Sequence, residues 1–200
     1  AVDGAARMKE LINDLLTLSR VGTRGAPLAA TDINDVIKRV LDNLQVSIAD
    51  SGGKVTHDSL PTVLADATQL SQLFQNLIGN SLKFHGDAAP EIHVGAVASG
   101  SNWHFTVRDN GIGLDMKHAE RVFVIFQRLH TREEYRGTGI GLSVCRKIVE
   151  RHGGRIWLES EPGAGTTVHF ELPAYKAKSL SVATDATTKT PGEHAHEQCR

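Results

Sequence analysis

A stripe of amide and amine side chains along residues 67–84 is the feature of this 200-residue sequence that most strongly suggests chemistry. Projected as a helix at 100° per residue, these side chains fall within a stripe about 80° wide, while the apolar side chains lie on another face. Asparagine is a poor helix former, so its presence in mid-helix carries a cost. An amide oxygen suits Mg²⁺ and a lysine suits phosphate, which favours a helix lining a polar site over a solvated face. The members of the stripe are Gln69, Gln72, Asn76, Asn80 and Lys83.

A glycine-rich loop, Asp109–Gly113 (DNGIG), directly follows an expected strand. Glycines at this point allow the backbone to approach a flat ligand closely. Asp109 can accept a hydrogen bond from an exocyclic amine such as adenine N6. The alternative is a simple turn that closes the strand.

Two further glycine clusters follow along the chain. Gly137–Leu142 (GTGIGL) leads directly into an expected helix, where backbone N–H groups and the helix dipole favour an anion. The Lys-Ser/Thr pair of a P-loop is missing, and no strand precedes the cluster as in a Rossmann fingerprint. A phosphate cradle and a flexible hinge both fit. Gly163–Thr166 by itself indicates an ordinary hairpin turn.

The surrounding elements indicate an α+β fold. Expected helices cover residues 5–21, 33–50, 67–84 and 140–152, with a short helix at 115–122. Expected strands cover 54–57 and 62–65, followed by hairpins built from 92–96 with 103–107 and from 155–160 with 166–172. Because strands occur in adjacent pairs, helices on one face of a mixed sheet are favoured over a parallel doubly wound sheet. Asp32 and Asp66 are the expected N-caps of the second and third helices.

The two ends of the chain differ from this body. Met8, Leu11, Leu15 and Leu18 have the spacing of a helix-bundle seam, although a helix docked on its own domain fits as well. Glycines and a proline make residues 22–30 a predicted linker. Residues 174–200 lack periodic apolar positions and are predicted to be disordered.

Composition excludes several classes of protein. With 22 basic and 23 acidic residues and a net charge of -1, the chain has no excess of positive charge for nucleic acid. No apolar run is long enough to span a membrane, and no signal peptide is evident. Cys145 and Cys199 are expected to be reduced thiols. We therefore expect this portion to be cytoplasmic, with membrane contact only through an upstream segment.

The clusters together resemble the boxes of the GHKL, or Bergerat-fold, ATPases in their histidine-kinase form. Asn76–Phe84 (NLIGNSLKF) resembles the N box, Asp109–Gly113 the first glycine box and Phe123–Arg128 (FVIFQR) the F box. Gly137–Leu142 and Gly163–Thr166 resemble the second and third glycine boxes. The lid and the helix after it are similar to the phytochrome-type branch of sensor kinases, and the likeness covers roughly residues 5–173.

This resemblance implies a Bergerat-fold two-layer sandwich preceded by an amphipathic dimerisation helix. The implied units are residues 1–21, the end of the dimerisation helix; 22–30, a linker; 31–173, the catalytic ATP-binding domain; and 174–200, a tail. The implied ligands are ATP and Mg²⁺. The implied partners are a second copy through the helix bundle and the receiver domain of a response regulator.

The resemblance also assigns roles to residues. Asn80 would hold the Mg²⁺, Lys83 would contact phosphate, and Arg128 would close onto the phosphates with the lid, residues 127–139. Asp109 would accept from the adenine amine, with Thr166 helping through water. The expected nucleotide contacts are Asn76, Asn80, Lys83, Phe84, Asp109, Gly111, Gly113, Gly137, Thr138, Gly139, Gly141, Leu142 and Thr166.

The implied function is transfer of the ATP γ-phosphoryl to a histidine. None of the ten histidines lies in residues 1–21, so the acceptor is expected upstream. Ser81 stands where the family usually has alanine, and Arg136 where this branch often has proline. One alternative is a nucleotide-binding and dimerisation module without turnover. Another is a chaperone, topoisomerase or mismatch-repair ATPase of the same fold, which the N-box lysine, the F box and the flanking helix disfavour.

Overall fold

A computed structural model of the chain describes residues 2–23, 25–127 and 138–175. Its α-helices are α1 (Val2–Thr23), α2 (Ile33–Ser51), α3 (Ala67–Lys83) and α4 (Gly141–Arg151). Its strands are β1 (Ala29–Asp32), β2 (Lys54–His57), β3 (Thr62–Ala65), β4 (Glu91–Ser99), β5 (Asn102–Asp109), β6 (Ile156–Glu161) and β7 (Gly165–Pro173). Two short 3-10 helices, η1 (Met116–His118) and η2 (Arg121–Phe123), follow the sheet's first hairpin.

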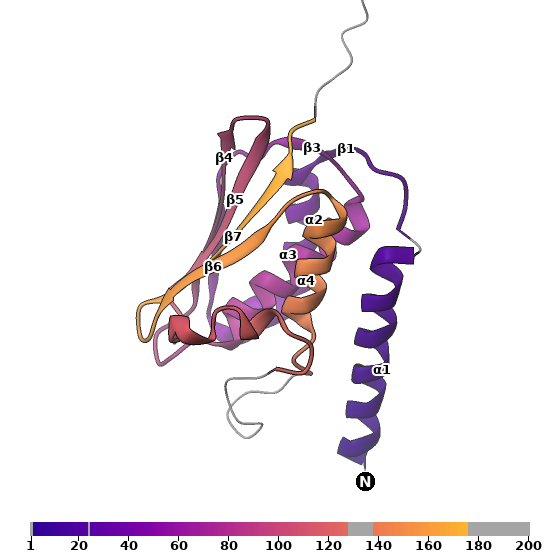
Figure 1. Cartoon of the computed structure of the whole chain (residues 1–200). Helices are drawn as coiled ribbons and strands as arrows, with labels where there is room; N and C mark the ends of the chain where they lie inside the picture. Colours follow the sequence, from indigo (N-terminus) through magenta and orange to yellow (C-terminus); the bar gives the residue numbers. More distant parts are fainter. Residues whose placement is uncertain (1, 24, 128–137, 176–200) are drawn as a thin grey trace, which may run out of the picture.

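The main sheet of the described residues has the order β2-β4-β5-β7-β6. β2 pairs with β4 in parallel, and the other neighbours are antiparallel. Helices α2, α3 and α4 cover one face of the sheet (Figure 1). The predicted two-layer arrangement of helices on one face of a mixed sheet is therefore confirmed.

The core lies between these two layers. Phe74 of α3 meets Phe105 of β5 and Phe170 of β7 edge-on, with ring centroids 6.3 and 5.6 Å apart. All three rings are fully buried. Alternation along the strands explains the arrangement, because successive side chains point to opposite faces. Ile92 of β4 and Val107 of β5 are likewise buried.

Capping residues set the helix boundaries as expected. Asp32 accepts a hydrogen bond from Asn34 N–H at the start of α2, and Asp66 accepts from Thr68 and Gln69 N–H at the start of α3. Such caps typically contribute about 1 kcal/mol each. Gly52 ends α2 in the left-handed conformation, with φ of 64°, which glycine adopts without strain.

The local structure differs from the expected elements at two places. Residues 115–122 form not one α-helix but η1 and η2, because so short a segment gains too few helical hydrogen bonds to offset nucleation. The predicted linker also contains the start of a strand, since Ala29–Asp32 pairs antiparallel with β3. Only this partner, distant in the sequence, makes the segment a strand.

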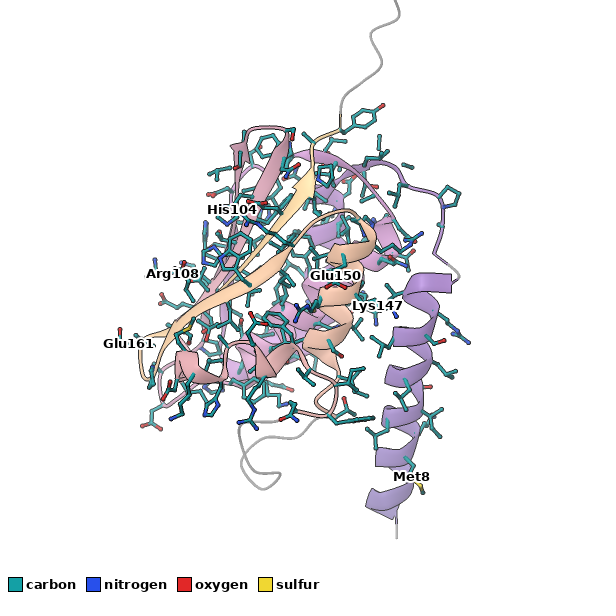
Figure 2. The ribbon with its side chains drawn as sticks, in the orientation of Figure 1. Met8, His104, Arg108, Lys147, Glu150 and Glu161 are labelled. Atoms are coloured by element: carbon teal, nitrogen blue, oxygen red, sulfur yellow. The ribbon has the colours of Figure 1, made fainter. Side chains whose placement is uncertain are left out.

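Helix α1 extends along α4 (Figure 1), and its apolar side chains are divided between two roles. Leu11 and Leu18 pack against the core, and Val21 is buried. The exposed members are Met8, Ile12, Leu15 and Leu16. Figure 2 shows Met8 near the far end of the helix, away from the body. The expected helix-bundle seam is thus divided. Leu11 and Leu18 pack on the chain's own domain, and Met8 and Leu15 are exposed.

A polar cluster holds the chain after α1 against the body. The Arg151 guanidinium donates to Gln69 Oε1 at 2.7 Å and to the Ala26 carbonyl at 2.8 Å. Asp66 Oδ2 accepts from Ala26 N–H at 2.8 Å. His152 Nε2 accepts from Asp66 N–H at 3.0 Å, and burial lowers the pKa of this imidazole. The neutral imidazole is therefore the form that fits the cluster.

No helix in the described part of the chain is both long enough and apolar enough to cross a bilayer.

Candidate nucleotide-binding site

The carboxylate of Asp109, at the end of β5, is the centre of the candidate site. Its Oδ1 accepts hydrogen bonds from Gly111 N–H at 2.9 Å and from Thr166 N–H at 3.0 Å. Its Oδ2 accepts from the Ser81 hydroxyl at 2.8 Å. The three donors come from the first glycine loop, from β7 and from α3, so the tertiary structure fixes the orientation of this side chain. Thr166 thus contacts Asp109 directly through its backbone.

Backbone hydrogen bonds join the three loops around this carboxylate. Ile112 N–H donates to the Phe84 carbonyl at 3.0 Å, and Gly163 N–H donates to the Ile112 carbonyl at 2.8 Å. The Ser160 hydroxyl donates to the Gly165 carbonyl at 2.8 Å and accepts from Leu114 N–H at 2.9 Å. The end of the N box, the first glycine box and the third glycine box therefore form one connected wall.

Glycines are required in this wall because backbone segments pass each other at contact. A Cβ at Gly111 would overlap with the Phe84 carbonyl oxygen, and one at Gly113 would overlap with the Glu161 carbonyl oxygen. Gly113 also has a φ of 62°, which L side chains rarely adopt. Gly165 has a φ of 95° and faces the Asp109 carbonyl in the same way. The DNGIG pattern predicted a close approach of backbone to a flat ligand, whereas these contacts are with other backbone segments of the protein.

The polar stripe of α3 is divided between two places. Asn76 donates from Nδ2 to the Gly141 carbonyl at 3.3 Å, and Asn80 lies half-buried one turn further along. Lys83 lies over the Phe84 ring, with Nζ 4.2 Å from the centroid. Gln69, by contrast, is buried against the last turn of α1, where its Nε2 donates to the Val21 carbonyl at 3.2 Å. Its expected place beside the polar site is therefore wrong.

The second glycine box lies at the start of α4. Ile140 is buried, and the helix begins at Gly141, beside Asn76. Gly139 has a φ of 75°, and its carbonyl accepts from Phe126 N–H at 3.1 Å. The expected contacts Thr138 and Leu142 are partly exposed on this segment. Arg128 and Gly137, with most of the expected lid, lie outside the described residues.

Cys145 lies beneath the site, fully buried on α4. Its Sγ is 3.9 Å from the Leu73 carbonyl, and burial raises the pKa of the thiol to about 12. The thiol is therefore protonated and unreactive at neutral pH, as expected for a reduced structural cysteine. Cys199 lies outside the described residues.

The outer face of the sheet carries a polar surface whose hollow reaches Asp109, Ser160 and Thr166 of the candidate site. Figure 2 shows His104 and Arg108 on the side of β5 away from the helices. The rings of His104, Trp157 and His169 stack there with centroids 5.2 to 5.3 Å apart. A hollow of about 660 Å³ opens on this face. Because Asn76 and Asn80 lie on the helical layer, the hollow is distinct from the polar stripe.

Residues 65–176 match the family described as histidine kinase-, DNA gyrase B- and HSP90-like ATPase. The chain belongs to this family. Cyanobacterial phytochrome A of Nostoc sp. is 51% identical over 173 residues, which are 86% of this chain and 23% of that protein. Phytochrome-like protein Cph1 of Synechocystis sp. is 50% identical over the same shares of both chains. The chain thus spans about a quarter of the length of these relatives.

Solved structures agree with this assignment. Full-length ShkA in complex with AMPPNP has a TM-score of 0.73 at 28% identity, over 88% of this chain and 37% of that one. The catalytic domain of histidine kinase ThkA has a TM-score of 0.64 at 27% identity, over 74% of this chain and 96% of that one. The resemblance to phytochrome-type sensor kinases is confirmed. This ATPase-family chain is homologous to the ATP-binding catalytic domains of sensor histidine kinases.

Proposed function

We propose that this chain binds Mg-ATP and transfers the γ-phosphoryl to a histidine on a segment outside it, as the catalytic part of a two-component sensor kinase. The observation that carries the proposal is the Asp109 carboxylate, which Gly111, Thr166 and Ser81 orient at the end of β5. A fixed acceptor at this place suits the exocyclic amine of adenine. The similarity to ShkA in its AMPPNP complex supports the same ligand class.

The roles of the other residues follow from their positions. Asn80 and Lys83 lie within one turn of each other on the polar stripe of α3. Gly139 and Gly141 lie at the start of α4. The first-turn N–H groups and positive end of α4 suit phosphate, as does the amine of Lys83. Phe84 follows α3 directly and would pack near the base. Arg128, on the proposed lid, would approach the phosphates.

The donor set near the phosphates fits Mg²⁺. The Asn80 amide oxygen is a hard ligand, and Mg²⁺ commonly takes one or two protein ligands together with phosphate oxygens and water. When bound, Mg²⁺ would neutralise charge on the phosphates. The residues of this chain would hold the nucleotide and exclude water, since phosphoryl transfer depends mainly on positioning and charge stabilisation.

The partners of the whole protein are part of the same proposal. Exposed Met8, Ile12 and Leu15 on α1 would face a second copy in a helix bundle. A response-regulator receiver domain would accept the phosphoryl group from the histidine. The domain limits 1–21, 22–30, 31–173 and 174–200 and the cytoplasmic location remain predictions.

Phosphoryl transfer tests the function directly. Incubated with Mg-ATP, the chain alone is expected to gain no acid-labile, alkali-stable phosphate, because no histidine lies in its α1 segment. A helical hairpin that carries the acceptor histidine, added as a separate polypeptide, is expected to become labelled. Stable phosphohistidine on the isolated chain would contradict the expected position of the acceptor. Mg-ATP binding without any labelling of the hairpin would favour a binding module without turnover.

Replacing Asn80 tests the metal site. Asn80→Ala is expected to weaken binding of Mg-ATP by at least about tenfold, since lost metal-site interactions commonly cost 10- to 100-fold. Binding of ATP in EDTA should change far less, because the amide would contact the metal rather than the nucleotide. Calorimetry under both conditions measures the difference. Asn43→Ala, at an exposed position on α2, is the matched control. Equal losses with and without Mg²⁺ would refute the metal-ligand role of Asn80.

A further inference from the structure

Ser81 contacts the carboxylate at the centre of the candidate site. Its side chain is buried, with 6% exposure, and its hydroxyl lies 2.8 Å from Asp109 Oδ2. The same hydroxyl is 3.2 Å from the Leu77 carbonyl one turn back along α3. A hydroxyl has a single proton to donate, and a charged acceptor makes the stronger hydrogen bond. The shorter contact, to the carboxylate, is therefore the one that takes the proton.

The hydrogen bonds of Asp109 then leave a defined place for a ligand. A carboxylate offers about four acceptor positions. Among the described residues, Gly111 and Thr166 N–H groups occupy Oδ1, and Ser81 occupies one side of Oδ2. The remaining position is on Oδ2. An amine donor of the ligand can approach the carboxylate there without displacing any protein donor.

We propose that Ser81 is a positioning residue for base recognition, which holds Oδ2 of Asp109 so that its open side faces the exocyclic amine of adenine. This inference rests on the proposed nucleotide function and adds a specificity determinant to it. Ser81 is adjacent to Asn80 on α3, so one helix would support both the metal ligand and the base reader. Without the hydroxyl, a second position on Oδ2 opens, and the carboxylate loses its only α3 donor among the described residues.

The same helix contains a serine that separates this role from simple packing. Ser71 donates to the Ala67 carbonyl at 2.8 Å, the bond one turn back along the helix and its only one within the described part of the chain. Such a bond satisfies a hydroxyl locally without any contact to the site. If Ser81 only required a local partner, the Leu77 carbonyl would suffice. Ser71→Ala is therefore the matched control for Ser81→Ala.

The test measures base preference rather than affinity alone. Wild type, Ser81→Ala and Ser71→Ala are titrated calorimetrically with Mg-ATP and with Mg-purine riboside triphosphate, which lacks the 6-amine. Ser81→Ala is expected to weaken ATP binding by about three- to tenfold, the scale of one misplaced hydrogen bond. Binding of the purine analogue should stay within about twofold, so the preference for ATP falls. Ser71→Ala should leave the preference unchanged.

Three further measurements complete the test. Ser81→Thr, which keeps the hydroxyl, is expected to restore the preference for ATP. In an Asp109→Asn background, Ser81→Ala should change the preference no further, because its effect passes through the carboxylate. Thermal unfolding of each variant identifies any loss of folding. Equal losses for both nucleotides, or an unchanged preference in folded Ser81→Ala, would overturn the role of Ser81 while leaving the proposed function intact. A wild-type chain that binds the two nucleotides equally would overturn the roles of both Ser81 and Asp109 in base recognition, whereas labelling of the hairpin tests the proposed function separately.

Discussion

Asp109→Asn is expected to reverse the base preference of the nucleotide site as well as weaken ATP binding. An asparagine amide oxygen can still accept from Gly111 and Thr166 N–H, so the NH₂ group takes the position of Oδ2. Ser81 can accommodate it by donating to the Leu77 carbonyl instead. The open side of residue 109 then carries a donor, which opposes the amine of adenine and matches the carbonyl of guanine.

The expected loss for ATP is about 30- to 100-fold, the scale of an unsatisfied buried donor, and the affinity for GTP should rise relative to ATP. Equilibrium titration with both nucleotides measures the ratio. Asp115→Asn is the control, since Asp115 is an exposed carboxylate that caps η1 and pairs with Lys117. An Asp109→Asn variant that binds ATP as tightly as wild type and still rejects GTP would show that Asp109 does not read the base.

Gly165→Ala is expected to disrupt both the fold and the site, whereas Gly163→Ala should be tolerated. Both glycines have positive φ, 95° and 81°. A Cβ at Gly165 would overlap with the Asp109 carbonyl oxygen and lie 2.9 Å from its carbon. A Cβ at Gly163 meets nothing within 4 Å. The two variants therefore share the conformational cost and differ only in the clash with backbone.

We expect Gly163→Ala to lower the free energy of unfolding by about 1–2 kcal/mol, the cost of a left-handed residue. Gly165→Ala should lower it by more than about 3 kcal/mol, because the end of β5 must move. That movement also displaces Asp109, so any folded variant should bind ATP poorly. Denaturant unfolding followed by nucleotide titration checks both effects. Similar unfolding free energies for the two variants would contradict the tight approach of β5 and β7.

Local patterns in the sequence were sufficient for most of the secondary structure. Helices α2, α3 and α4 begin and end within about a residue of the predicted limits, since caps, apolar periodicity and terminal glycines act over a few neighbouring residues. The alternating strands β4 and β5 were predicted for the same reason. The order of the glycine clusters also predicted the family, which the match over residues 65–176 confirms. The roles of individual site residues remain predictions.

Contacts between segments distant in the sequence determined the structural features that local patterns did not predict. Ala29–Asp32 is a strand because β3 lies beside it, and Gln69 contacts the last turn of α1 rather than the polar site. Periodicity places Gln69 on the correct helix but cannot name its partner, and the pattern of residues 22–30 predicted a linker rather than the start of a strand. The apolar side chains of α1 likewise show one spacing, and only their packing divides them between the body and the exposed surface.

The candidate site depends both on the local sequence and on the tertiary structure. The sequence determined which residue types are present at the end of β5, along α3 and before α4, because each group occupies a short segment. The tertiary structure alone brought Ser81, Gly111 and Thr166 to one carboxylate, and placed Ser160 between the loops. Two of these donors to Asp109 are backbone N–H groups, which any residue except proline supplies. Side-chain identity therefore carries no signal for them, and their position follows only from how the strands and the helix pack.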